Sequence, residues 1–164
     1  MATLTQLDEK LGEVLGLAQA AQQATDKVGK LAKDEEESEL VALMEQMGEQ
    51  AAELERRCTE VAGTRDGKKT AIEDKARETK SEITDFMTTY LEDGDALDGL
   101  EFLSMAEAGE LAHWQIVAKL NEKAGDPEIG QLVEFAVPVQ QEHVLAVADR
   151  SLELAADEDP HEES

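Results

Sequence analysis

The segment Glu107-Ala108-Gly109-Glu110-Leu111-Ala112-His113-Trp114 holds a Glu-x-x-His pair and the only tryptophan of the chain. A second polar group follows at Gln140-Gln141-Glu142-His143. The chain has three histidines, and two of them lie in these two segments. Residues three or four positions apart share one face of a helix. Glu110 and His113 are therefore expected to lie together on one helix, and Gln140 and His143 on another.

Apolar residues surround both polar groups at helical spacing. The helix expected from about Asp98 to Lys123 has two adjacent rows, which are Phe102, Ala106, Gly109, His113, Ile116 and Leu120, and Leu103, Glu107, Glu110, Trp114 and Val117. The last helix has the row Ile129, Val133, Ala136, Gln140, His143, Val147 and Leu154, with Glu142 on the neighbouring row. These rows place Glu107, Glu110 and His113 on the core side of one helix. They place Gln140 and His143 on the core side of the other, and Trp114 is expected to be a packing residue.

Three further helices are expected before these two, at about 4–31, 39–62 and 68–92, and the last helix is expected at 127–156. The first two carry apolar residues at alternating spacings of three and four, which is typical of a helix-packing seam. The first half of 68–92 is highly charged, which predicts a solvent-exposed and loosely attached segment. The second half is expected to be packed, because it carries Phe86, Met87, Tyr90 and Leu91.

Turn and capping residues mark several helix ends. Gly125-Asp126-Pro127 combines a glycine stop, an aspartate N-cap and a proline at the first helical position. Ser38 and Asp66 are expected to cap the helices that follow them. Pro138 lies inside the last helix, where a kink or bulge is expected. Long amphipathic helices with short connections predict an all-α bundle of antiparallel neighbours.

Composition restricts the kind of protein. A chain of 164 residues favours one domain, expected over 1–156 and followed by an acidic, disordered tail at 157–164. The 39 acidic and 15 basic residues give a net charge of -24, which argues against binding nucleic acid or an anionic membrane surface. Cys58 is the only cysteine, so no internal disulfide is expected. The chain shows neither a signal-peptide pattern nor a long apolar run, and a cytoplasmic protein is expected.

The two polar groups have three interpretations. Carboxylates and imidazoles together suit iron, manganese or zinc, and facing helices would bring the two groups to a similar depth. A buried Glu–His pair is also compatible with a structural polar network that contains no metal. The third interpretation is that both groups are ordinary solvent-exposed side chains on the surface.

These residues resemble the ferritin-like superfamily of carboxylate-bridged four-helix bundles. The likeness rests on 102–114 and on 132–149. In that superfamily, two helices each supply a Glu and two others each supply a Glu-x-x-His motif. The resemblance implies four long helices plus a crossover or accessory helix at 68–92. It also implies a metal site, with iron as the first expectation and manganese or zinc as alternatives. Its candidate ligands are Glu107, Glu110, His113, Gln140, Glu142 and His143.

The chain departs from the family pattern in its first hairpin. That hairpin has no histidine, and no glutamate lies on either of its seams; its nearest candidates are Glu13, Gln22, Gln50 and Glu53. The second motif begins with Gln140 instead of glutamate. A single metal ion, a site completed in a homo-oligomer and a bundle that has lost the site all remain open. Iron handling or reactivity toward O₂ or peroxide is the first functional hypothesis, and a metal-free structural or assembly bundle is the alternative.

Overall fold

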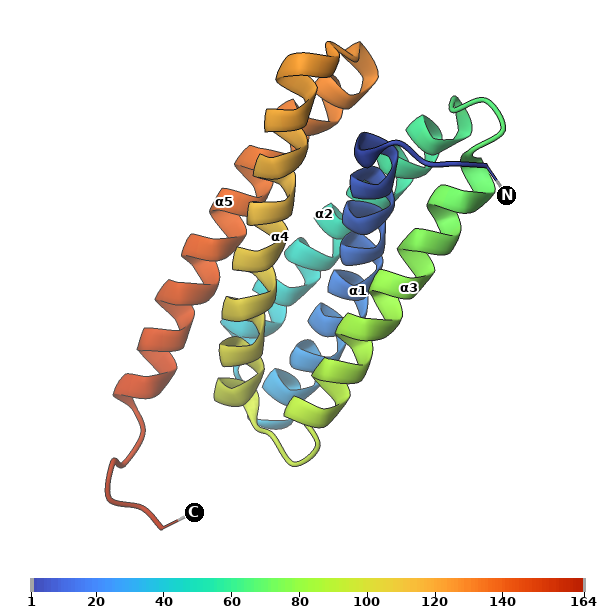
Figure 1. Ribbon diagram of the computed structural model, residues 1–164. Helices are drawn as coiled ribbons and strands as arrows, with labels where there is room; N and C mark the ends of the chain where they lie inside the picture. Colours follow the sequence, from blue (N-terminus) through green and yellow to red (C-terminus); the bar gives the residue numbers. More distant parts are fainter. Residues whose placement is uncertain (1, 164) are drawn as a thin grey trace.

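The computed structural model describes residues 2–163 and confirms the all-α fold class. Its helices are α1 (Gln6–Asp34), α2 (Ser38–Gly63), α3 (Lys69–Tyr90), α4 (Ala96–Ala124) and α5 (Pro127–Ala156). They are shown in Figure 1, and no strand occurs among the described residues. No helix in the described part of the chain has an apolar stretch long enough to cross a bilayer.

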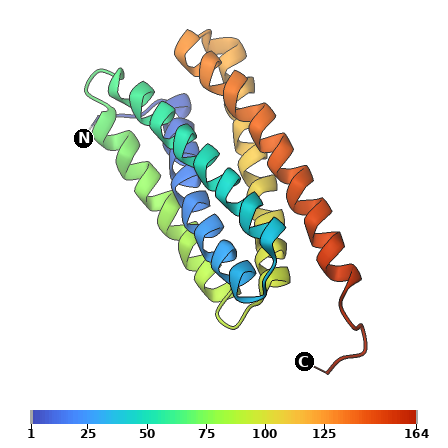
Figure 2. The same ribbon diagram turned by 180° about the vertical axis from the view of Figure 1, so that it is seen from behind.

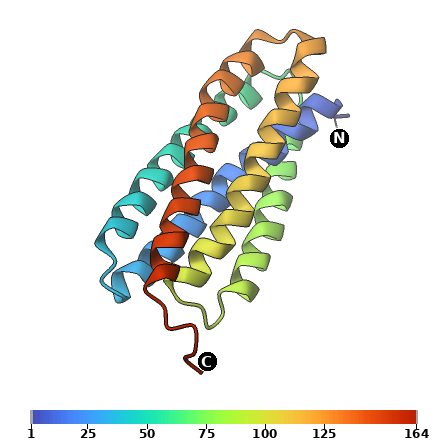
Figure 3. The same cartoon turned by 90° about the vertical axis from the view of Figure 1, so that its left-hand side faces the viewer.

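The helices form two antiparallel hairpins joined by α3. α1 packs against α2, α3 and α4, and α5 packs against α4 and α2. α3 lies on the outer side of α1, which Figure 2 shows between α2 and α3. Because α3 runs back along the bundle, α2 and α4 point in the same direction (Figure 1). Figure 3 shows α4 and α5 side by side, with the non-helical end of the chain leaving the bundle beyond α5.

The apolar core is divided into two clusters by a layer of polar side chains. One cluster includes Leu54 of α2, Trp114 of α4 and Ala136 of α5. The other includes Met47, Leu103 and Val147 of the same three helices. The buried polar residues lie between these positions on α4 and α5; they are Glu107, Glu110, Gln140 and His143. The polar groups noticed in the sequence therefore lie midway along the bundle.

The seams predicted for the first hairpin are largely confirmed. On α1 the buried seam residues are Leu11, Val14, Ala18, Thr25 and Val28, and on α2 they are Leu40, Met44, Met47, Ala51, Leu54 and Cys58. The turn between α4 and α5 is also as expected. Gly125 has a φ of 63°, and Asp126 accepts hydrogen bonds from the backbone N–H groups of Glu128 and Ile129. α5 continues without a break through Pro138.

Two of the predicted N-caps are wrong. Ser38 is the first residue of α2, and the cap position is Glu37, whose side chain makes no capping hydrogen bond. Asp66 lies in the preceding turn, and Lys68 occupies the cap position of α3, again without a side-chain hydrogen bond. Lys68 forms an ion pair with Asp8 of α1 at 2.6 Å, so this helix start is held by a contact between helices.

The expectation for the first half of α3 is wrong, and the expectation for the second half is confirmed in part. Its charged first half is tightly packed, because Ile72 and Ala76 are buried against α1. A Cβ atom at Gly16 would lie 2.8 Å from Cβ of Thr79, so glycine is what permits this close approach. In the second half, Met87 and the C-cap residue Leu91 are buried as expected, whereas Phe86 is 47% and Tyr90 is 38% exposed. The charged residues of the first half lie on the outer faces, which a count of charges along the sequence does not reveal.

Candidate functional site: a buried carboxylate and imidazole layer

Four polar side chains from the last hairpin form the centre of the site. Glu107 and Glu110 are one turn apart on α4, and Gln140 and His143 are one turn apart on α5. Each of the four residues is at most 4% exposed. α2 adds the partly buried side chain of Gln50 from the facing hairpin. Burying so many polar groups is unfavourable unless they are hydrogen-bonded or paired.

Hydrogen bonds connect three helices through His143. Gln140 donates its Nε2–H to Oε2 of Glu107 at 3.1 Å, and Nδ1 of His143 lies 3.3 Å from the same oxygen. Nε2 of His143 lies 2.6 Å from the carbonyl oxygen of Gln50. Both ring nitrogens therefore face acceptor oxygens, which are satisfied when each nitrogen carries a proton.

Glu110 is the incompletely satisfied member of the layer. Its Oε1 atom is buried and has no hydrogen-bond partner among the described residues. Burial raises the pKa of Glu110 well above its usual value, and the nearby negative charge of Glu107 raises it further, while a hydrogen bond from Gln140 partly opposes the change. A carboxyl group in such surroundings holds its proton at a higher pH than an exposed glutamate does.

A buried thiol lies near Glu110, and a carboxylate of α2 lies near the same thiol. Cys58 of α2 is fully buried. Burial raises the pKa of this thiol, and the charges of Glu110 and Glu55 raise it further, so Cys58 remains a thiol. Glu55 accepts hydrogen bonds from the amide groups of Gln19 and Gln22 on α1. The first hairpin therefore contributes one thiol and a carboxylate that is held by two amide groups.

The structure separates His113 and Glu142 from the other four predicted residues. His113 is half-exposed: its Nδ1–H donates to the carbonyl oxygen of Gly109 at 2.8 Å, and its Nε2 lies 3.6 Å from Glu13 of α1. Glu142 is exposed. The expectation that His113 points into the core is wrong, because α4 is turned so that the row containing Glu107, Glu110 and Trp114 faces inward. Trp114 is fully buried, as expected of a packing residue.

Three residues of α2 were not predicted to belong to the site. They are Gln50, Glu55 and Cys58. Gln50 lies three residues after Met47 and four before Leu54, so its spacing puts it beside the seam of α2. That signal was available in the sequence. The proximity of Cys58 to Glu110 was not, because it depends on how the two hairpins are rotated against each other.

The arrangement has the donor atoms of a metal site but not a formed cluster. Within residues 2–163, no three His, Cys, Asp or Glu side chains are arranged so that they could hold a metal ion. Glu107 and His143 are within contact distance, and Glu110 lies close enough for the charge of Glu107 to act on it. Glu107 and His143 are therefore neighbouring donors, and Glu110 is the other carboxyl group of the layer.

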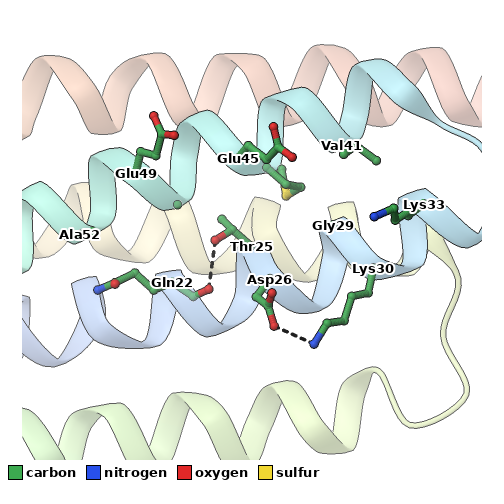
Figure 4. Close-up of a pocket in the computed structure, with 12 residues that line it drawn as sticks. Gln22, Thr25, Asp26, Gly29, Lys30, Lys33, Val41, Glu45, Glu49 and Ala52 are labelled. Carbon is green, nitrogen blue, oxygen red and sulfur yellow. Dashed lines mark hydrogen bonds and ion pairs between the residues drawn. The ribbon is translucent and has the colours of Figure 1, made fainter.

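A solvent-exposed groove lies between α1 and α2, separate from the buried polar layer. It encloses about 590 Å³ and runs past Gly29 and Gly48, which have no side chains to fill it. Asp26 and Lys30 pair along α1 at 2.9 Å, and Figure 4 shows Glu45 and Glu49 on α2, with side chains that point away from α1. Its charged groups face solvent, in contrast with the buried layer between α2, α4 and α5.

Comparisons of this chain with protein-family models, with curated proteins and with solved structures give no match.

Proposed function

We propose that this chain is a ferritin-like bundle that binds one transition-metal ion at Glu107, Glu110 and His143. Iron is the first candidate, and manganese and zinc are the alternatives. The observation that carries the proposal is a pair of buried carboxyl groups beside an imidazole, with Oε1 of Glu110 lacking a partner. Two carboxylates and an imidazole form a donor set that suits these metals.

Charge balance supports a divalent ion. Two ionised carboxylates close together in the core repel each other and are costly to bury. A divalent cation would neutralise both, with neutral His143 as the third donor. Glu110 would then gain the partner that its Oε1 atom lacks.

Gln50 is the positioning residue in this proposal. Its carbonyl oxygen accepts the Nε2–H of His143 at 2.6 Å, which leaves Nδ1 as the nitrogen on the side of Glu107. Hydrogen bonds of this kind fix the tautomer and the orientation of a metal-bound imidazole. An iron ion held here would supply redox chemistry toward O₂ or peroxide, and the two apolar clusters would exclude bulk water from it.

The topology also supports the ferritin-like reading. α1 with α2 and α4 with α5 are antiparallel hairpins, and α2 and α4 run in the same direction (Figure 1). α3 takes the place of the long link between the second and third bundle helices that the resemblance implies.

Metal content tests the proposal directly. The protein would be produced with added iron, manganese or zinc, and bound metal would be measured by mass spectrometry. We expect close to one ion per chain in the wild type, and loss of that ion in Glu107→Gln and His143→Ala. Glu142→Gln is the matched control, because Glu142 is exposed and adjacent to His143. His113→Ala should also keep the ion, since His113 lies outside the layer. A metal-free wild type in all three media, or an ion that persists in His143→Ala, would refute the proposal.

A metal-free structural bundle is the second candidate. Both ring nitrogens of His143 already have hydrogen-bond partners, and the network joins α2, α4 and α5. In a metal-free bundle, the buried polar layer would align the two hairpins and would bind no ligand. The wild type would then be metal-free in every medium, while His143→Ala would still be less stable than the wild type.

We also propose that the chain forms a homo-oligomer. Leu145 and Leu152 of α5 are 66% and 72% exposed, and their spacing of seven residues puts them on one face of the helix. Exposed apolar side chains that share a face often mark an interface. Light scattering of the purified protein should give a multiple of the 17.9 kDa chain mass. A Leu145→Ser and Leu152→Ser double variant should shift it toward the monomer, and a monomeric wild type would refute this proposal.

A further inference from the structure

A small apolar cavity lies between α1, α3 and α4, on the side of the polar layer away from His143. It has a volume of about 150 Å³. α1 contributes small side chains to its wall, including Ala20, Ala21 and Ala24, and α3 contributes Ile83 and Phe86. Packed protein interiors leave few spaces larger than a water molecule. The alanines of α1 leave this space opposite the α4 residues.

Two carboxyl residues lie among the apolar residues of the α4 wall. Glu107 and Glu110 of α4 both line it. Glu110 is 3% exposed, and its Oε1 atom has no hydrogen-bond partner among residues 2–163. A carboxyl oxygen accepts a hydrogen bond whether or not the group is ionised. The cavity therefore combines apolar walls with one unused acceptor.

The cavity also has a route to the surface. Phe86 and Met105 line it, and each is 47% exposed. His113 lines it as well, with a side chain that is 36% exposed. His143 does not line it. A molecule entering between these side chains would reach Glu110 without displacing His143.

We propose that this cavity binds a small, neutral, ring-sized organic molecule that carries one hydroxyl or N–H donor. The ring would lie against the alanines and Phe86, and the donor would bond to Oε1 of Glu110. An apolar cavity of about 150 Å³ is large enough for a benzene ring. Sites for small ligands typically combine apolar walls with a few placed polar groups. The inference does not depend on the metal site, although Glu110 belongs to both.

Fluorine NMR with a matched pair of probes tests this inference. The full-length protein would be treated with a chelator and titrated with 4-fluorophenol and with fluorobenzene, which differ by one hydroxyl group. We expect both probes to bind, with 4-fluorophenol about tenfold tighter, as one added hydrogen bond to a buried acceptor predicts. Glu110→Met should abolish the preference while leaving fluorobenzene binding in place. Glu110→Gln keeps an acceptor oxygen and should retain the preference.

Filling the cavity provides a second, independent readout. Ala21 is only half-buried, so Ala21→Leu should fold while blocking both probes. Ala112→Leu makes the same change at an exposed position of α4 outside the cavity and should leave binding unaltered. Equal affinity for the two probes, or full binding in Ala21→Leu, would overturn the inference.

Different variants distinguish the metal-site proposal from the cavity proposal. His143→Ala should lose metal and keep the preference for 4-fluorophenol. Ala21→Leu should keep metal and lose both probes. Loss of probe binding in chelated His143→Ala would count against the cavity proposal, because His143 lies outside its walls.

Discussion

Nε2 of His143 lies 2.6 Å from Oε1 of Gln50, and this hydrogen bond joins α5 to α2 inside the bundle. The other ring nitrogen of His143 faces Glu107 of α4. One imidazole therefore links three helices at the layer between the two apolar clusters. Its contacts are geometric constraints on how the two hairpins align, whether or not a metal is bound.

Replacing Gln50 should destabilise the bundle through His143. Gln50→Leu would leave a buried ring N–H without an acceptor, which costs about 1–3 kcal/mol. Urea unfolding, followed by circular dichroism, would measure the loss in the free energy of unfolding. Gln46→Leu is the control, because Gln46 is exposed one turn earlier on α2. Equal stability of the two variants would show that the bond contributes nothing.

Glu110→Gln should remove a pH-dependent loss of stability. The pKa of Glu110 is raised in the folded state above its ordinary value of 4.5, by burial first and by Glu107 second. Above pH 4.5 the unfolded chain releases this proton while the folded chain keeps it, so folded stability declines with rising pH until the folded pKa is passed. The variant has no such proton. Its stability relative to the wild type should therefore increase as the pH rises from about 4 toward neutrality.

Unfolding curves of both proteins over this pH range, in the presence of a chelator, would check the result. Glu142→Gln provides the comparison, because Glu142 is an exposed carboxyl group. The difference between this control and the wild type should stay nearly constant with pH. A similarly flat difference for Glu110→Gln would mean that Glu110 titrates as a solvated group.

Two glycines should respond oppositely to alanine. A Cβ atom at Gly16 would lie 2.8 Å from Cβ of Thr79, so Gly16→Ala should push α3 away from α1 at a cost of about 1–3 kcal/mol. A Cβ atom at Gly109 would meet no other atom within 4 Å. Gly109→Ala should therefore stabilise α4 by up to about 1 kcal/mol through helix propensity. Thermal unfolding of the two variants would test this, and the same sign of change in both would contradict the packing described for α3.

Pro138→Ala should stabilise the protein. Pro138 is exposed within α5 and has no N–H to donate to the carbonyl oxygen of Glu134. Alanine restores that donor, and the gain is limited to about 3 kcal/mol, the difference between the two residues inside a helix. Denaturant unfolding would measure it. A loss of stability would mean that the proline shapes α5 in a way the core requires.

The sequence by itself determined the helices and most of the core. Spacings of three and four identified the seams of α1 and α2 and the buried row of α5, because the period of a helix decides which residues share a face. Gly125, Asp126 and Pro127 marked the turn between α4 and α5 through local backbone chemistry. Gln140 and His143 were correctly placed in the interior, since they interrupt a row that is otherwise apolar.

Only the tertiary structure decided which face of α4 turns inward and how closely α3 approaches α1. Two adjacent rows of α4 carried comparable apolar content, and the rotation that buries Glu107 and Glu110 leaves His113 half-exposed beside Glu13. Likewise, the charged first half of α3 packs tightly because glycines on a different helix make room for it. Rotation and approach depend on pairs of surfaces, and periodicity along one helix describes only one surface of each pair.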